Sequence, residues 1–240
     1  MISINKAIFL DRDGTINIDK DYIYKVSDFE FIDQAPEALK LLQDGGFQLI
    51  IITNQSGIAR GYYTEEDYEK LNDWLLKTLT EQYGVNITAS YFCPHHPEAV
   101  VEKYRKNCNC RKPKLGLFER AIAEHDIDLS SSYAIGDKLR DLAICERQAE
   151  IRLSDTHSGL TGLTGVAEAV DEVENRRAGQ KRQNCQGFLI GSKESEEVIR
   201  SVKAGERQNI QYVPDLHTAA HRKNEVGFFF GKYYRIDCNG

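Results

Sequence analysis

The 240-residue sequence contains no apolar run that approaches membrane-spanning length, and no signal-peptide-like hydrophobic stretch precedes its first predicted strand. It also lacks a continuous run of Lys and Arg, and its formal net charge of -6 disfavours nucleic acid as the main partner. These absences predict a cytoplasmic protein that binds neither membranes nor nucleic acid.

Cysteine is sparse, with six residues in the chain. Disulfide frameworks are typical of small secreted domains, so free thiols or metal ligands are the expected roles here. A hydrophobic fraction of 41% and a charged fraction of 28% are those of an ordinary folded protein. The length allows one large α/β domain or two small ones.

Strand-like and helix-like segments alternate over the first 136 residues. Short apolar runs that read as buried strands alternate with longer segments of helical apolar spacing. The pattern predicts an α/β fold: a doubly wound, Rossmann-like parallel sheet with helices on both faces. The predicted strands are residues 6–10, 47–53, 87–92 and 132–135, and the predicted helices are residues 36–43, 65–83 and 115–124.

The first strand ends in two carboxylates, Asp11 and Asp13, followed by Gly14. Alternate residues of an extended segment point the same way, so both acids can face one site. Two close carboxylates repel each other and are most easily kept ionised by a bound cation. An Asx-turn that caps the strand is the alternative, but Gly14 favours a sharp turn whose amides approach an anion.

Other polar residues lie at later strand ends or in the connecting loops. Thr53 ends the second strand, Lys112 precedes a helix, and Asp137 follows the fourth strand. Each alone has a simple explanation as a strand end, a solvated charge or a helix cap. The carboxyl ends of parallel strands can converge on one crevice, so together these residues predict a site.

A second cluster consists of Cys93-Pro94-His95-His96-Pro97 and Cys108-Asn109-Cys110. Three thiolates and one imidazole suit tetrahedral Zn²⁺. A loop with free thiols is the alternative.

With these motifs in place, the sequence resembles the haloacid dehalogenase-type phosphatases over about residues 1–147. The four family motifs match at Asp11 to Thr15, at Thr53, at Lys112 and at Gly136 to Asp141. The resemblance implies an α/β domain without a large separate cap. It also implies a two-step mechanism in which Asp11 attacks phosphorus and Asp13 moves the proton.

The resemblance also implies which residues hold metals and substrate. Mg²⁺ would be held by Asp11, the Asp13 backbone carbonyl and Asp137, while Thr53 and Lys112 position the phosphoryl oxygens. A structural Zn²⁺ would be held by Cys93, Cys108, Cys110 and His95 rather than His96. The candidate substrate-binding residues are Asn54, Arg60, Arg111 and Lys138.

Two further polar residues can each be interpreted in two ways. Arg111 either reaches a substrate oxygen or forms a structural ion pair. Asp141 either holds a neighbouring group or faces solvent one helical turn beyond Asp137.

Within the family, the long loop between the two ligand pairs resembles the branch that acts on D-glycero-D-manno-heptose 1,7-bisphosphate. The expected reaction is removal of the C7 phosphate from this small phosphorylated sugar, in the synthesis of nucleotide-activated heptose for lipopolysaccharide core or surface glycans. The histidinol-phosphate phosphatases are the sister branch and the alternative. A zinc-braced, non-catalytic interaction module is the alternative of another class. A monomer is expected.

The chain departs from the family pattern beyond Arg147. Residues 148–183 contain no aromatic residue and no proline, and we predict a surface insertion there, with one helix at residues 166–174. The phosphatase domain then spans residues 1–222, and its fifth strand is residues 187–191. Residues 150–153 are the alternative candidate for the fifth strand. Residues 223–240 form an extension without an assigned role. The other elements expected are a helix at 194–202, a strand at 209–213 and a helix at 215–222.

Overall fold

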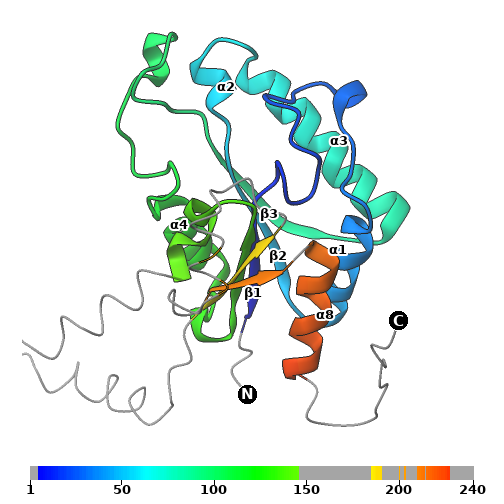
Figure 1. Cartoon of the computed structure of the whole chain (residues 1–240). Coiled ribbons are helices and arrows are strands. Elements are labelled where there is room, and N and C mark those ends of the chain that lie inside the picture. The colour runs from blue at the N-terminus through cyan, green and yellow to red at the C-terminus, as the bar shows by residue number, and fades with distance from the viewer. Residues whose placement is uncertain are drawn as a thin grey trace, which may run out of the picture.

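The computed structural model describes residues 5–145, 185–190, 200, 203, 210–213 and 215–227. Six parallel strands form one sheet in the order β3-β2-β1-β4-β5-β6 (Figure 1). This is the doubly wound arrangement, in which the strand order reverses between β1 and β4. The strands are β1 (Ala7–Leu10), β2 (Gln48–Asn54), β3 (Ile87–Cys93), β4 (Tyr133–Gly136), β5 (Gln186–Ile190) and β6 (Ile210–Val213).

Helices cover both faces of the sheet. The apolar residues of α1, α3 and α8 pack with Ile8, Leu10 and Ile51 on one face, and those of α4 pack with Phe9 and Ile52 on the other. Every residue of β1 is buried because it meets a helical layer on each side. The helices are α1 (Ala35–Asp44), α2 (Ser56–Ala59), α3 (Glu65–Tyr83), α4 (Gly116–His125) and α8 (Leu216–Gly227), with 3-10 turns η1 (Val26–Asp28), η2 (Glu102–Tyr104), η3 (Leu129–Ser131) and η4 (Leu139–Leu142).

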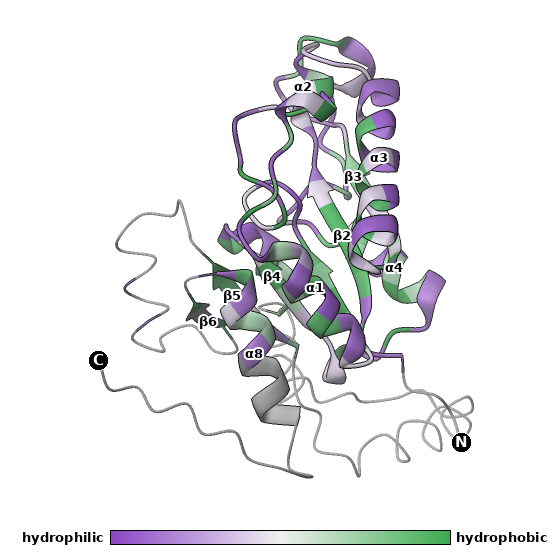
Figure 2. Ribbon diagram, turned by 90° about the vertical axis from the view of Figure 1, so that its right-hand side faces the viewer, coloured by the Kyte–Doolittle hydropathy of each residue, from purple (hydrophilic) through white to green (hydrophobic). Residues whose placement is uncertain are grey.

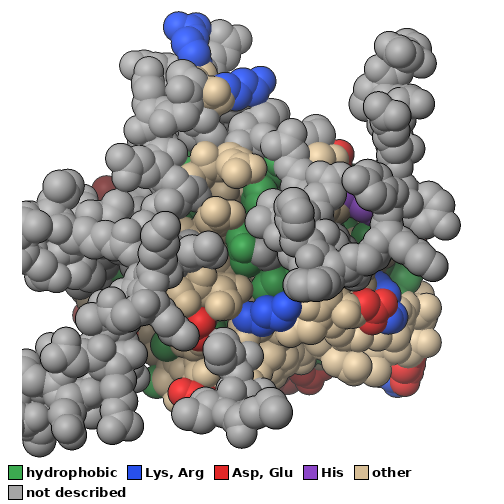
Figure 3. Space-filling model, turned by 90° about the horizontal axis from the view of Figure 1, so that it is seen from below, with side chains coloured by type: hydrophobic (Ala, Val, Ile, Leu, Met, Phe, Trp, Pro, Cys, Tyr) green, Lys and Arg blue, Asp and Glu red, His purple; other side chains and the backbone are tan. Residues whose placement is uncertain are grey.

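The distribution of hydropathy follows the layers. Hydrophobic residues concentrate in the strands between the helices, and α3 presents hydrophilic residues along its outer side (Figure 2). In the view from below, the visible Lys, Arg, Asp and Glu side chains of the described residues are scattered rather than gathered by sign (Figure 3). No helix within the described ranges combines the length and apolar content needed to span a membrane.

The longest described helix, α3, begins where the sequence predicts. Thr64 is its N-cap and forms a capping box with Asp67, in which each side chain accepts a hydrogen bond from the other residue's backbone N–H. The helix ends at Gly84, whose positive φ of 64° lets its N–H reach the last carbonyls of the helix. The predicted bounds of α3 are therefore confirmed.

The carboxyl half differs from the prediction at the end of α8. The segment after β4 begins as the 3-10 turn η4, in which Asp141 Oδ2 accepts a hydrogen bond from the Lys138 backbone N–H at 3.0 Å, and residues 143–145 continue it as α-helix. Helix α8 continues to Gly227, so residues 223–227 belong to it and not to an extension.

The strand expected at residues 187–191 is present as β5, which pairs in parallel with β4. Strand β6 lies within the predicted residues 209–213. Residues 148–183, with the rival strand at 150–153 and the helix expected at 166–174, lie outside the described residues. Most of the helix expected at 194–202 and residues 228–240 also lie outside them.

Candidate active site

The polar residues expected to converge do lie at one end of the sheet. Asp11 directly follows β1, Thr53 lies near the end of β2, and Asp137 directly follows β4. A pocket of about 270 Å³ opens there. It is lined by Asp11, Asp13, Asp19, Asp21, Tyr22, Thr53, Asn54, Gln55, Ser56, Arg60, Tyr63, Arg111, Lys138 and Arg140.

A buried ammonium lies beneath the pocket between two buried carboxylates. Lys112 Nζ is 3.0 Å from Asp11 Oδ1 and 2.8 Å from Asp141 Oδ1, and it donates a hydrogen bond to the Ile52 carbonyl at 2.6 Å. Burial alone would lower the pKa of Lys112, but the two carboxylates outweigh burial and raise it. Lys112 is therefore held as a cation against the oxygens of Asp11 and Asp141.

The structure decides between the two interpretations of Asp141. Its side chain does not face solvent: the residue is only 3% exposed and pairs with Lys112. The 3-10 turn η4 turns the chain back toward the strand end, and Gly136 leaves room for it because a Cβ there would collide with the Cβ of Asp141. Asp141 thus holds a neighbouring group, which was the other interpretation.

Three carboxylates form a candidate metal site. One oxygen each of Asp11, Asp137 and Asp141 lies within 4.8 Å of the others. Burial, followed by repulsion from Asp11 and Asp141, raises the pKa of Asp137 to about 7. Burial and Asp141 raise the pKa of Asp11, although Lys112 opposes them. A bound cation would relieve this repulsion, so the oxygen-rich cluster suits a hard divalent ion.

Gly14 brings the acidic loop close to this cluster. Its φ is +83°, and a Cβ at that position would lie 2.5 Å from Asp137 Oδ2. A larger residue would therefore displace either the turn or the Asp137 carboxylate.

Asp13 is held by a separate set of donors. The Arg12 guanidinium donates to both of its carboxylate oxygens, at 3.0 Å each from Nη2. Asn17 Nδ2 donates to Oδ1 at 3.0 Å, and Gln55 Nε2 donates to Oδ2 at 2.9 Å. Arg12 is fully buried whereas the Asp13 side chain is 23% exposed, so only the acid reaches the pocket.

Asn54 lines the pocket but also fixes the backbone of Lys112. Its Oδ1 accepts a hydrogen bond from the Lys112 backbone N–H at 3.0 Å, and its Nδ2 donates to the Lys112 carbonyl at 3.2 Å. This pair of bonds ties the end of β2 to the loop that carries Lys112.

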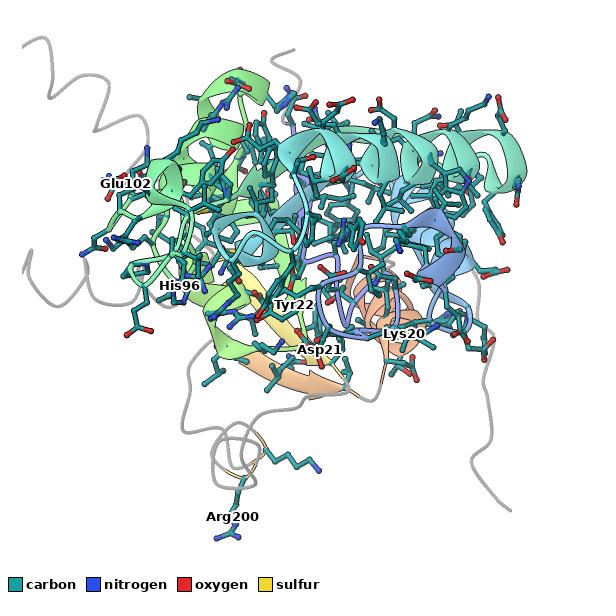
Figure 4. The ribbon with its side chains drawn as sticks, turned by 90° about the horizontal axis from the view of Figure 1, so that it is seen from above. Lys20, Asp21, Tyr22, His96, Glu102 and Arg200 are labelled. Atoms are coloured by element: carbon teal, nitrogen blue, oxygen red, sulfur yellow. The ribbon has the colours of Figure 1, made fainter. Side chains whose placement is uncertain are left out.

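Three of the side chains that line the pocket are cationic and were predicted to bind substrate. Arg60 lies 6.0 Å from the Tyr22 ring centre, Arg111 Nη1 donates to the His95 carbonyl at 3.3 Å, and Lys138 Nζ is 3.6 Å from Asp137 Oδ2. Viewed from above, Tyr22 and Asp21 lie between the segments that carry His96 and Lys20 (Figure 4). All three cations line the pocket, as expected for binding a phosphorylated ligand.

The cysteine and histidine cluster forms as predicted. Cys110 Sγ lies 3.1 Å from Cys93 Sγ and 3.2 Å from both Cys108 Sγ and His95 Nδ1. The ligand atoms of these four side chains lie close enough together to hold one metal ion. The nitrogen atom among them belongs to His95 and not to His96. His96 Nδ1 instead accepts a hydrogen bond from the Glu98 backbone N–H. The set could hold a tetrahedral metal ion beside Arg111 and Lys112.

Comparison with known proteins assigns the chain to a family. The sequence model of the family described as "Polynucleotide kinase 3 phosphatase" matches residues 6–157. The chain belongs to this phosphatase family. The match extends beyond residue 147 and includes residues 150–153, so family likeness continues into the segment that the sequence analysis predicts to be an insertion.

The chain is similar in sequence to two named heptose bisphosphate phosphatases. It is 51% identical over 141 residues to the D-glycero-beta-D-manno-heptose-1,7-bisphosphate 7-phosphatase of Haemophilus ducreyi, covering 59% of this chain and 77% of the relative. The enzyme of the same name from Escherichia coli is 47% identical over 136 residues, which cover 57% of this chain and 71% of the relative. The resemblance noted from the motifs is confirmed.

Solved structures of haloacid dehalogenase-type phosphatases share the fold. A HAD-like phosphatase from Mesorhizobium loti has a TM-score of 0.65 and 26% identity, covering 93% of this chain and 87% of that one. The D,D-heptose 1,7-bisphosphate phosphatase of B. bronchiseptica, complexed with magnesium and phosphate, has a TM-score of 0.65 and 24% identity. That match covers 92% of this chain and 99% of that chain.

Several residues of this phosphatase site were not singled out by sequence reasoning, among them Arg12, Gln55, Tyr63 and Arg140. Arg12 lies between the two motif acids, and Gln55 follows the second motif, so proximity to the motifs was the available signal. Arg140 lies within the fourth motif, so the same signal was available for it. Tyr63 carried no comparable signal, because only the folded loops bring it to the pocket.

Proposed function

We propose that this phosphatase removes the C7 phosphate of D-glycero-β-D-manno-heptose 1,7-bisphosphate. The observation that carries the proposal is the 51% identity over 141 residues to a relative of that name. The β anomer at C1 follows from the relatives' names alone. The pocket supports the assignment because it is lined both by the proposed catalytic carboxylates and by the cations Arg60, Arg111 and Lys138.

Asp11 is the nucleophile in this proposal. Its Oδ1 accepts hydrogen bonds from Lys112 Nζ and from the Arg12 backbone N–H at 2.8 Å. Oδ2 is then the oxygen that attacks phosphorus, forming an aspartyl-phosphate while the ester bond breaks. Lys112 stabilises the negative charge that the phosphoryl group carries through the transfer. Thr53 positions a phosphoryl oxygen.

Asp13 moves the proton in both half-reactions. It protonates the departing C7 oxygen in the first step and accepts a proton from the attacking water in the second. Its partly exposed carboxylate reaches the pocket beside Asp11. The second step releases inorganic phosphate and restores Asp11.

Mg²⁺ fits the carboxylate cluster that Asp11 shares with the pocket. Asp11, Asp137 and the Asp13 backbone carbonyl would hold it, and Asp141 balances Lys112 beside it. When bound, the ion supplies positive charge that neutralises and orients the phosphoryl oxygens. The support is the chemistry of the donor set: three crowded, buried carboxylates with one ammonium among them.

We assign a structural Zn²⁺ to Cys93, His95, Cys108 and Cys110. All four positions of a tetrahedral ion would be filled by protein, so the ion would brace the loop and leave no site for water. Arg111 and Lys112 directly follow Cys110, so bracing this loop holds both cations in place.

The zinc assignment predicts about one equivalent of zinc in the purified protein. Elemental analysis should find it lost from His95→Ala and from the Cys108→Ser, Cys110→Ser double variant. The neighbouring His96→Ala is the matched control and should retain it. Zinc-free wild-type protein, or equal zinc in the His95 and His96 variants, would contradict the assignment.

The substrate assignment is tested by phosphate release with and without Mg²⁺. We expect the β-heptose bisphosphate to be hydrolysed at C7 with a higher kcat/KM than its α anomer, and with a much higher kcat/KM than histidinol phosphate. The reverse order for histidinol phosphate would move the protein to the sister branch. Release from no phosphate ester would favour the non-catalytic interaction module.

A further inference from the structure

The side-chain amide of Gln55 links Asp13, the proposed general acid, to buried residues by hydrogen bonds. Its Nε2 donates to Asp13 Oδ2 and to Thr53 Oγ1, both at 2.9 Å. Its Oε1 accepts a hydrogen bond from Tyr63 Oη at 2.6 Å. The residue is only 2% exposed, so these contacts are protected from competing water.

The orientation of this amide is determined by its neighbours. Arg12 Nη2, which can only donate, lies 3.4 Å from Oε1, on the same side as the Tyr63 hydroxyl. Burial raises the pKa of Tyr63, so its hydroxyl keeps the proton that it donates. The amide NH₂ must therefore face Asp13 and Thr53.

We propose that Gln55, supported by Tyr63, is a positioning residue that aims the Asp13 carboxylate at the leaving oxygen of the substrate. Arg12 holds both oxygens of Asp13 and Asn17 holds Oδ1, while Gln55 adds a second contact to Oδ2 that comes from the β2 side of the pocket. Since the carboxylate is held at both oxygens, its plane is fixed. This inference rests on the proposed function, in which Asp13 acts as general acid and then as general base.

The proton transfers show where positioning matters. In the first step the bond from Asp11 Oδ2 to phosphorus forms, the ester P–O bond breaks, and the proton of Asp13 passes to the departing oxygen. In the second step water attacks phosphorus and gives its proton to Asp13, and the aspartyl-phosphate bond breaks. Gln55 takes part in neither bond change, so its effect depends on how much the departing oxygen needs a proton.

Two esters of similar size separate this role from a purely structural one. Benzyl phosphate leaves as an alkoxide that requires protonation, whereas 4-nitrophenyl phosphate leaves as a stable phenolate. For Gln55→Met, we expect kcat/KM for benzyl phosphate to fall at least about tenfold more than kcat/KM for 4-nitrophenyl phosphate. A general loosening of the fold would lower both values by the same factor.

Three further variants complete the experiment. Tyr63→Phe removes only the bond to Oε1 and should show the same leaving-group dependence to a smaller degree. Gln55→Glu keeps the shape but loses the donors to Asp13 and Thr53, so it should resemble Gln55→Met. Gln43→Met is the matched control, because Gln43 also uses both amide atoms, toward Gly84 and Asn86, at the end of α1. It should leave the ratio of the two substrates unchanged.

The outcomes distinguish this inference from the proposed function. Selective loss of benzyl phosphate turnover in the Gln55 and Tyr63 variants supports it. Equal losses with both esters, or no loss, overturn it while leaving the phosphatase assignment intact. Wild-type protein that releases phosphate from neither these esters nor the heptose bisphosphate overturns the proposed function, and the inference with it.

Discussion

Lys112 illustrates how single residues are fixed at this site. Moving an ammonium and a carboxylate out of water costs several kcal/mol for each ion unless the pair is well bonded. Lys112 meets this requirement through Asp11, Asp141 and the Ile52 carbonyl, all within 3.0 Å of its Nζ. The charge at the base of the pocket is therefore built into the protein before any substrate binds.

At the same scale, Asp11→Asn should abolish turnover. The change removes the attacking carboxylate but keeps the shape, and Lys112 keeps Asp141 as its partner. We expect kcat/KM for the heptose bisphosphate to fall at least about a thousandfold, which is about 4 kcal/mol of barrier. Circular dichroism and the melting temperature check that the fold is kept. Substantial Mg²⁺-dependent activity in this variant would exclude the aspartyl-phosphate mechanism.

At the scale of elements, the strand ends and loops carry the chemistry while the helices hold the sheet. Helix α3 packs Leu75 and Leu79 against the same core as α1 and α8. Its start depends on the capping box of Thr64 and Asp67, which satisfies N–H groups that the first turn leaves unbonded.

The capping box gives α3 a pH-dependent contribution to stability. Hydrogen bonds from Thr64 lower the pKa of Asp67 below its ordinary 3.8. Because the pKa of Asp67 is lower in the folded state than in the unfolded state, its ionised form stabilises the folded protein above pH 3.8. This contribution is lost as the pH falls through the folded-state pKa. Urea unfolding should therefore show Asp67→Asn to be less stable than wild type by a constant amount between pH 5 and 7, with the difference shrinking below pH 3.8.

Asp73→Asn is the matched control for this prediction. Asp73 is an exposed residue of the same helix, and no hydrogen bond of its side chain is found among the described residues. It should leave stability nearly unchanged over the same range. If both variants behaved alike, the cap would not be the source of the effect.

At the scale of the whole molecule, the central question is how the sheet is completed beyond β4. Strand β5 pairs with β4, and Leu189 lies beside Gly136 at the site end of the sheet. Cys145 and Cys185 flank the intervening segment, and their sulfurs lie 2.9 Å apart in the core. The two ends of that segment are therefore adjacent.

Deleting residues 148–183 and joining Arg147 to Asn184 should keep Mg²⁺-dependent activity. Closing a loop costs entropy that grows only logarithmically with its length, so removing the segment changes this cost little. We expect activity within about tenfold of wild type, a barrier change below about 1.4 kcal/mol. Phosphate release by the purified variant is the measurement.

Loss of the fold in this variant would contradict the predicted insertion. The family match includes residues 150–153, although β5 is the strand that pairs with β4. If the deletion unfolds the protein, residues 148–183 contribute to the stability of the domain and do not form a dispensable surface insertion.

The sequence by itself determined the elements whose signals are local. Apolar runs marked β1 to β4, and Thr64 and Gly84 marked the ends of α3. The two close pairs in the cysteine and histidine cluster were also predictable, because a two-residue spacing already limits the distance between side chains, whereas the choice of His95 over His96 came from the family resemblance.

Only the tertiary structure decided the surroundings of Asp141, Arg12 and Gln55. Asp141 is buried because η4 folds back onto β4 and meets Lys112 from another loop. Arg12 and Gln55 meet at Asp13 because β1 and β2 are neighbours in the sheet. Periodicity reports which face a residue occupies, whereas ion pairs and hydrogen bonds between distant segments depend on strand order and on the path of each loop.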